Sequence, residues 1–356
     1  MRSGPTIKDI ARAVGVTPAT VSYVLSQNPR QSISAQTRQK VLEAARELGY
    51  VPNGAAKVLR NAPSYCVGVA IEKELMLSRF SMVLQGIRDR LEGEGYNLML
   101  CSFGQRHGIY PDYINNTLER RIDGVIFMGK DNTGPTPEAE ELIARYHLPF
   151  VLYDCGYTGR PYSTVELGYE QAGFDMADSM LAGGARRLLY LRPDVDNYQE
   201  QQREAGVRRA LAARPDVTLQ VMCTDTTRDM VRYTPQDRLG LGIELKADEG
   251  VARFLAGQVI PVLAEFAPHD GVITSWGVYA PLLYSLLAQA GKPLQIGALS
   301  DMLVSGMLQG RIKVCRMPGY QAGVECARLL LARLAGDETP QTRTLPMPLG
   351  NPAMYF

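Results

Sequence analysis

The chain has 356 residues, of which 46% are hydrophobic and 21% are charged, and this length predicts two or three domains with sizeable cores. The composition excludes collagen, coiled coil and bulk disorder, and no apolar run reaches the roughly 18 residues of a membrane span. The net charge is +1, but residues 1–60 hold nine basic and three acidic residues. Such a basic segment indicates either nucleic-acid binding or a solvated basic surface.

The cysteines and histidines form no metal or catalytic pattern. No two of the six cysteines are closer than eleven residues, and the three histidines, His107, His147 and His269, are isolated. The chain has no Gly-rich phosphate loop, so an enzyme of nucleotide-binding type lacks its usual support. The N-terminus has no apolar core of a signal peptide. We therefore expect a cytoplasmic protein that is not an enzyme and carries no metal or cofactor.

Residues 6–49 predict three short helices. Thr6 with Asp9, Thr17 with Pro18, and Ser34 are N-terminal capping patterns, and Gly15 and Gly49 are typical helix ends. Apolar residues recur at helical spacing within each segment. The expected inward residues are Ile7, Ile10, Ala11, Val14, Val21, Val24, Leu25, Val41, Leu42, Ala45 and Leu48. Two such helices joined by a short turn with Gly predict a helix-turn-helix.

The second helix then has a face that packing does not use. If Val21, Val24 and Leu25 are buried, its N-terminal exposed face would enter a DNA major groove, where base edges present a unique pattern. Thr17 and the N–H groups at the helix start would meet phosphate. The alternative is a three-helix bundle that binds protein.

Three segments carry a family resemblance. Thr6-Ile-Lys-Asp-Ile-Ala-Arg-Ala-Val-Gly-Val-Thr-Pro-Ala-Thr-Val-Ser-Tyr-Val-Leu25, Thr37-Arg-Gln-Lys-Val41 and Leu48-Gly-Tyr-Val-Pro-Asn53 resemble the DNA-binding head of the lactose-repressor (LacI/GalR) family. The resemblance continues along nearly the whole chain. It implies a transcriptional regulator, expected to be a repressor, that binds a palindromic operator as a homodimer. One departure is Tyr23, where the family often has Arg. It matters because Tyr, unlike Arg, cannot form two hydrogen bonds with one guanine.

The hinge is predicted at residues 51–64, between a head at 1–50 and a body at 65–356. Asn53 can cap a helix of about seven residues, which is marginal alone. The resemblance implies that this helix folds on DNA, pairs with its twin in the minor groove and inserts Leu59 between base pairs. The alternative is a plain linker. The residues expected to contact DNA are Thr6, Lys8, Thr17, Pro18, Ala19, Ser22, Tyr23, Thr37, Asn53, Ala56, Lys57 and Leu59.

The body alternates apolar runs with amphipathic stretches. Predicted strands are residues 66–71, 98–101, 124–128, 149–153, 188–191, 219–222, 271–275 and 312–315. Predicted helices are residues 82–94, 113–121, 138–146, 169–182, 199–213, 251–266, 278–290 and 321–334. Repeated strand–helix units predict an α/β body of two doubly wound parallel-sheet subdomains, which the resemblance likens to periplasmic sugar-binding proteins. Their expected extents are about 65–163 with 311–336, and about 164–310 with 337–356.

Two further segments bear on assembly. Residues 226–249 follow no predicted element, and we assign them no function. Residues 339–356 hold four prolines and no leucine heptad, so we expect a dimer rather than a tetramer. The resemblance places the predicted helices 82–94 and 113–121 at the dimer interface.

The resemblance also implies an effector cleft. Arg203 matches the family's ligand-binding Arg, and Asp301 lies near its late Asp. However, Trp276-Gly277 replaces the usual Asn-Asp, and Leu167-Gly168 replaces a usual Asp-Asn. Trp276 is therefore expected either to stack on the ligand, a carbohydrate by family preference, or to plug a cleft without an effector. The expected effector residues are Glu72, Phe80, Tyr153, Asp154, Arg203, Trp276 and Asp301. A solute-binding protein is the alternative of another class, which the basic head disfavours.

Overall fold

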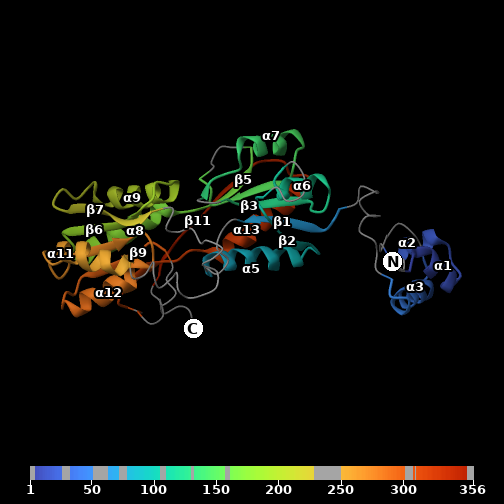
Figure 1. The fold of residues 1–356 in the computed structure, drawn as a ribbon, viewed down its shortest axis with the longest axis horizontal. Coiled ribbons are helices and arrows are strands. Elements are labelled where there is room, and N and C mark those ends of the chain that lie inside the picture. The colour runs from blue at the N-terminus through green and yellow to red at the C-terminus, as the bar shows by residue number, and fades with distance from the viewer. Residues whose placement is uncertain are drawn as a thin grey trace. The chain divides into compact units, whose positions relative to one another are not determined.

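The computed structural model describes residues 5–25, 33–50, 63–71, 78–104, 110–129, 132–156, 161–227, 250–300, 308 and 310–350. The chain divides into two compact units, Met1–Ser64 and Tyr65–Phe356 (Figure 1). No helix in these ranges is long and apolar enough to cross a membrane. Some predictions fall outside the described residues: those for Asn53, Ala56, Lys57, Leu59, Glu72 and Asp301, and most of the segment 226–249.

Within its described residues the first unit holds three helices, as the sequence predicted for residues 6–49. They are α1 Ile7–Val14, α2 Pro18–Leu25 and α3 Ala35–Glu47. Their buried residues form one small core, made of Ile10, Ala11, Val21, Val24, Val41, Ala44 and Ala45. Because these residues recur at helical spacing, each helix turns one apolar stripe inward and leaves its other face exposed.

Capping residues fix where α1 begins and ends. The backbone N–H and the hydroxyl of Thr6 both donate to the Asp9 carboxylate, at 2.8 and 2.7 Å. These two hydrogen bonds, the hydroxyl's first, lower the pKa of Asp9 below its ordinary value. Gly15 ends the helix with φ of 73°, in the left-handed region that glycine adopts without a steric cost. The left-handed residue ends α1 and begins the short turn that leads to α2.

The second unit contains two six-stranded sheets. The first has the order β11-β5-β4-β3-β1-β2 and is entirely parallel, and the second has the order β12-β10-β9-β8-β6-β7, in which only β12 is antiparallel. The first sheet comprises β1 Cys66–Ile71, β2 Asn97–Cys101, β3 Gly124–Met128, β4 Phe150–Tyr153, β5 Ser163–Leu167 and β11 Thr342–Leu345. The second comprises β6 Arg187–Asp194, β7 Thr218–Thr227, β8 Gly271–Thr274, β9 Gln295–Ala298, β10 Lys313–Cys315 and β12 Leu349–Gly350.

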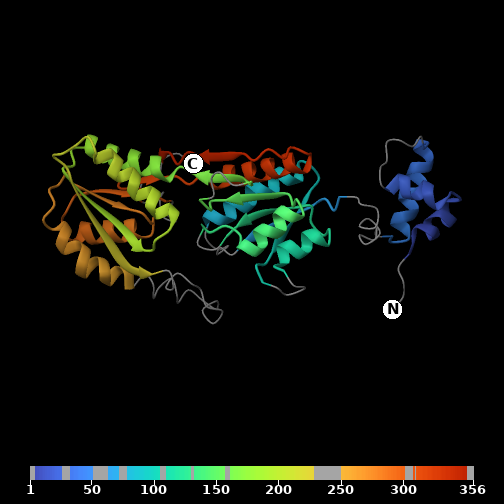
Figure 2. The same ribbon diagram turned by 90° about the horizontal axis from the view of Figure 1, so that it is seen from above.

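Helices cover both faces of each sheet, which makes two lobes (Figure 2). In the first lobe these are α5 Ser78–Glu92, α6 Asp112–Leu118, α7 Pro137–Arg145 and α13 Gly319–Leu334. In the second they are α8 Tyr169–Ala182, α9 Tyr198–Leu211, a π-helical turn Leu255–Val259, α11 Ile260–Leu263 and α12 Tyr279–Gln289. Successive residues of β4 pack on opposite faces of the sheet. Val151 joins the core beneath α5 and α13, and Leu152 joins the core beneath α6 and α7. The predicted doubly wound body is confirmed.

The chain crosses between lobes at positions that differ from those predicted. The crossings follow β5, β10 and β11, so residues 163–167 and 342–345 belong to the first sheet and 313–315 to the second. The predicted limits near 163, 311 and 337 are therefore wrong by several residues. Four strands of the two sheets were not predicted: β5, β9, β11 and β12.

The missed strands do not form long apolar runs. Within β5 the Thr164 hydroxyl donates to Glu166 Oε1 at 2.6 Å, and the Gly156 N–H donates to Glu166 Oε2 at 3.1 Å. These bonds satisfy the buried Glu166 carboxylate. A strand that contains such a residue is not a continuous apolar run, so it was not predicted. The edge strand β11 is largely exposed, and β12 has only two residues. Strands were predicted from apolar runs, which mark burial on both faces of a sheet, and β11 and β12 are not buried in this way.

Glycines bring helices close in both lobes. A Cβ at Gly323 of α13 would overlap the carbonyl oxygen of Val83 in α5, and one at Gly86 of α5 would overlap that of Tyr320. In the second lobe a Cβ at Gly206 of α9 would overlap the carbonyl oxygen of Glu170 in α8. The helix pairs α5–α13 and α8–α9 therefore require glycine for backbone contact, and α9 carries Arg203.

We expect Gly323→Ala to lower the free energy of unfolding by about 1–3 kcal/mol, because the added methyl group forces α13 away from α5. Gly257→Ala is the matched control, since no atom lies within 4 Å of its Cβ position and Ala favours a helix by about 1 kcal/mol. Urea unfolding followed by circular dichroism measures both. Equal stability of the two variants would contradict the close contact.

Candidate nucleic-acid interface and ligand site

The N-terminal half of α2 presents an exposed face. Val21 and Val24 are buried in the head core, whereas Thr17, Pro18 and Ala19 are exposed. Tyr23 is 36% exposed, and Ser22 is half-buried. The helical period therefore leaves on one side the residues that the sequence analysis assigned to base contacts.

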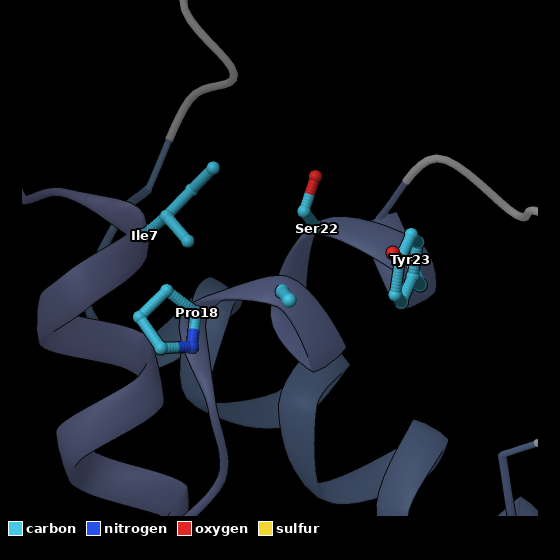
Figure 3. Close-up of a pocket in the computed structure, with 5 residues that line it drawn as sticks. Ile7, Pro18, Ser22 and Tyr23 are labelled. Atoms are coloured by element: carbon cyan, nitrogen blue, oxygen red, sulfur yellow. The ribbon is translucent and has the colours of Figure 1, made fainter.

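These side chains surround an open pocket in the first unit. The pocket has a volume of about 350 Å³, and it is lined by Pro18, Ala19, Ser22 and Tyr23 of α2 with Ile7 of α1 (Figure 3). Ile7 was predicted only as a core residue, because it belongs to the apolar stripe of α1. The structure leaves it half-buried, so its outer edge contributes to this surface.

The three predicted threonines lie at the starts of the three head helices. The Thr20 N–H donates to Thr17 Oγ1 at 3.1 Å, and the Thr37 N–H donates to Ser34 Oγ at 3.1 Å. Thr6 bonds to Asp9 as described above. Thr6, Thr17 and Thr37 therefore stabilise helix starts, while Lys8 is exposed on α1.

Asp154 connects the two lobes. It follows β4 of the first lobe, is buried, and has φ of 53°, which is uncommon for a residue other than glycine. Its carboxylate accepts from Asn132 Nδ2 at 2.7 Å, from the Tyr169 hydroxyl at 2.9 Å and from Gln199 Nε2 at 3.3 Å. Tyr169 and Gln199 belong to second-lobe helices. We call the region of Asp154, Tyr169, Gln199, Glu200, Arg203 and Trp276 the lobe junction.

Arg203 is buried at this junction. Its guanidinium donates to Glu200 Oε1 at 2.5 Å and lies over the ring of Tyr169, 4.5 Å from the centroid. Burial, and next the Asp154 carboxylate, raise the pKa of Tyr169 well above its ordinary value, so its hydroxyl remains a hydrogen-bond donor. Only 6% of the Arg203 side chain and 1% of the Glu200 side chain are exposed, so solvent screens this ion pair little.

Trp276, which follows β8, contacts the same Glu200 carboxylate. Its Nε1 donates to Glu200 Oε1 at 3.1 Å, and its indole stacks on Tyr279 with 8° between the planes. The Tyr279 hydroxyl in turn shares a hydrogen bond with Thr224 at 3.1 Å. The structure thus brings the predicted residues Arg203 and Trp276 together through Glu200, which the sequence analysis missed.

Two further predicted ligand residues, Phe80 and Tyr153, lie within the described ranges. Phe80 and Tyr153 are buried in the core of the first lobe, with Tyr153 next to Asp154 in the chain. The signal that could have identified Glu200 is its spacing from Arg203, because residues three apart on a helix share a face.

Several buried polar atoms around the Arg203–Glu200 pair have no hydrogen-bond partner within the described part of the chain. They are Gln199 Oε1, Glu200 Oε2, Arg203 Nε, Tyr190 Oη and Ser275 Oγ, and Arg192 Nε near Glu200 is a sixth. Arg192 is half-buried, and the other five residues are at most 5% exposed. Buried polar groups in native proteins are nearly always satisfied, so a ligand or ordered water is the expected partner. No group of three metal-binding side chains gathers within the part of the chain that the structure describes.

Comparison with known proteins adds family evidence for the head. The model of "Bacterial regulatory proteins, lacI family" matches residues 6–53. The HTH-type transcriptional regulator GntR of Pseudomonas aeruginosa is 30% identical over 338 residues, which cover 94% of this chain and 90% of GntR. The HTH-type transcriptional repressor PurR of Vibrio campbellii is 31% identical over 208 residues, or 58% of this chain, and the match spans 60% of PurR.

Solved structures share the fold. The lac repressor dimer bound to operator and the anti-inducer ONPF has a TM-score of 0.73 at 19% identity, with 97% of each chain covered. The complex of the transcriptional regulator CelR with cellobiose has a TM-score of 0.60 at 19% identity, with 97% of this chain and 98% of CelR covered. At this identity the likeness shows the fold, a helical head and a two-lobed α/β body, and no more.

Proposed function

Because the chain belongs to the lacI family of bacterial regulatory proteins, we propose that it is a transcriptional repressor that binds a palindromic DNA operator as a homodimer. The exposed face of α2 carries this proposal. It presents Ala19, Ser22 and Tyr23 from a helix whose opposite side is fixed in the head core. Two heads related by a dimer axis would read two half-sites. The protein would act in the cytoplasm, without catalytic activity.

The proposal includes the hinge residues Asn53, Ala56, Lys57 and Leu59 as minor-groove contacts, by family resemblance. The charge distribution supports DNA as the partner, since residues 1–60 hold nine basic and three acidic residues. Basic residues that neutralise phosphates release counterions, and this makes the affinity fall steeply with salt. A solute-binding protein would have no reason for such a head.

Selection of bound sequences from a random DNA pool by the full chain tests this function. We expect a palindromic consensus, and a binding constant whose logarithm falls linearly with the logarithm of salt concentration. Recovery of no consensus would overturn sequence-specific regulation. Footprinting of a single asymmetric half-site would overturn the symmetric dimer.

Replacing Tyr23 by Ala should change the preferred base at one position of each half-site rather than weaken all sequences equally. Tyr23 is exposed at the edge of the pocket on α2 (Figure 3), where a side chain can reach a base edge. One well-formed base contact contributes about 1–3 kcal/mol of discrimination. Selection with the Tyr23→Ala variant measures this, and recovery of the unchanged consensus would assign Tyr23 to packing or phosphate contact.

We also propose a small effector, a carbohydrate, at the lobe junction. Its support is the set of unsatisfied buried atoms together with the indole of Trp276. A ligand held by both lobes would change the junction and hence the spacing of the two hinges. Such coupling is typically about 1–3 kcal/mol, and operator DNA must alter effector affinity by the same factor.

A second candidate is a regulator whose junction is plugged and takes no effector. It is favoured by the indole of Trp276, which already has an acceptor in Glu200 and a stacking partner in Tyr279. Trp276 is the only tryptophan of the chain, so its fluorescence reports on this site. If sugars, nucleosides and small acids change neither its emission nor the melting temperature, the plugged junction is the correct description.

A further inference from the structure

Glu200 neutralises Arg203 before any ligand arrives. Glu200 is fully buried, and a single oxygen, Oε1, accepts from both the Arg203 guanidinium and the Trp276 indole. An arginine that binds a ligand carboxylate uses its charge and its planar fork of donors. Here one of those donors and the charge are already engaged with a carboxylate of the chain.

The remaining charges near Arg203 do not favour an incoming anion. Asp154 is a second buried carboxylate whose charge acts on Arg203, so Glu200 is not the only negative charge that this guanidinium feels. Arg192 is the other cation near Glu200, and it is paired with Glu204 at 3.4 Å. Glu204 is paired in turn with the exposed Arg208 at 2.7 Å. Arg192 Nε has no hydrogen-bond partner in the described chain, but Arg192 and Arg203 are each already paired with a carboxylate. An added carboxylate would therefore meet like charges in a buried setting, where they repel strongly.

The unsatisfied atoms at the junction point to the same ligand chemistry. Gln199 Oε1 and Glu200 Oε2 are acceptors, Arg203 Nε is a donor, and the hydroxyls of Tyr190 and Ser275 can do both. A ligand hydroxyl donates and accepts, so a set of hydroxyls can satisfy all of them. An ionised carboxylate only accepts, so wherever it faces one of the two acceptors it would leave that acceptor without a donor.

We infer that Glu200 determines the charge of the effector: it makes the lobe junction bind a neutral, hydroxyl-bearing molecule and reject the corresponding carboxylate. This inference rests on the proposed effector function. It assigns to Glu200, rather than to Arg203, the choice between a sugar and a sugar acid. Trp276 would report the choice, because its indole shares Oε1 of Glu200 with Arg203.

Matched pairs of sugars and sugar acids test the inference on the full chain. The probes are glucose against gluconate, galactose against galactonate, and xylose against xylonate, titrated by Trp276 fluorescence and by calorimetry. We expect at least one neutral sugar to bind at least about tenfold more tightly than its acid, as for rejection of a like charge. Glu200→Gln, which keeps the size and an acceptor for Trp276, should remove most of that ratio by strengthening binding of the acid.

Glu170→Gln is the control, because Glu170 is an exposed carboxylate of α8 that pairs with Arg209. It should leave the ratio unchanged. The inference is overturned if the acids bind the unaltered chain as tightly as the sugars, if the ratio persists in Glu200→Gln with native circular dichroism, or if no neutral sugar binds. The measurement on the unaltered chain decides the matter even where the variant does not fold.

Binding of DNA is measured separately by the sequence selection described above. A chain that selects a palindrome and binds acids keeps the proposed regulatory function and loses only this inference. A chain that binds a neutral sugar but selects no DNA loses the proposed function while its ligand preference stands.

Discussion

Replacing Ala19 by Glu should reduce affinity for the selected operator by at least about 100-fold, which corresponds to roughly 2.7 kcal/mol. Ala19 is exposed on α2 and lines the pocket with Pro18 and Ser22, so the new carboxylate would project from the face assigned to the major groove. It would lie close to phosphates, and juxtaposed like charges cost several kcal/mol. Fluorescence anisotropy with labelled operator measures the effect.

The same substitution elsewhere on the head separates position from net charge. Ala13 is also exposed and helical, but it belongs to α1 and does not line the pocket. We expect Ala13→Glu to weaken binding by no more than about tenfold, since one additional negative charge acts on DNA only at a distance and through screening salt. Melting curves of both variants should match that of the unaltered chain. Equal losses at Ala13 and Ala19 would remove α2 from the interface.

The three helices of the head were predicted closely because their determinants are local. Leu48, which was expected to face inward, is instead 41% exposed. Thr6 with Asp9 and Ser34 with Thr37 form the hydrogen bonds that their spacing implies, and Gly15 adopts the left-handed conformation that ends α1. Each of these signals lies within one helical turn. The burial of Val21 and Val24 then followed from the helical period alone.

The body was predicted as a class but not in its connections. An apolar run identifies strands such as Gly124–Met128, all of whose residues are buried. It cannot identify β5, whose Glu166 is buried because Thr164 and Gly156 supply hydrogen bonds. The lobe to which a short strand belongs depends on the neighbour with which it pairs. Val314 of β10 pairs with Ala298 of β9, and nothing in the local sequence fixes that partner.

The lobe junction shows the same limit at the level of single residues. Family resemblance identified Arg203, Asp154 and Trp276 as candidates. It did not identify Glu200, which links Arg203 to Trp276, and Trp276 lies 76 residues beyond Glu200 in the chain. Spacing within α9 shows that Glu200 and Arg203 share a face, but burial of both side chains depends on packing of the completed lobe. The contact that sets the charge of the junction is therefore a property of the tertiary structure.

The Arg203–Glu200 pair gives the second large expected effect, on stability. Arg203→Met should lower the free energy of unfolding by about 3–5 kcal/mol, because it leaves the buried Glu200 carboxylate without its ion-pair partner. Glu200→Met should do the same for the guanidinium, although Asp154 remains near Arg203. Urea unfolding at neutral pH, followed by circular dichroism, measures both variants.

The double variant distinguishes a coupled ion pair from two independent contributions. Replacement of both residues by Met removes both charges, and replacement of a buried ion pair by apolar side chains is often neutral. One cost remains, because Trp276 Nε1 loses its acceptor. Leaving a buried donor without an acceptor costs about 1–3 kcal/mol. We therefore expect the double variant to be less destabilised than either single variant. Additive losses would show instead that Arg203 and Glu200 stabilise the second lobe separately, through its packing rather than through their charges.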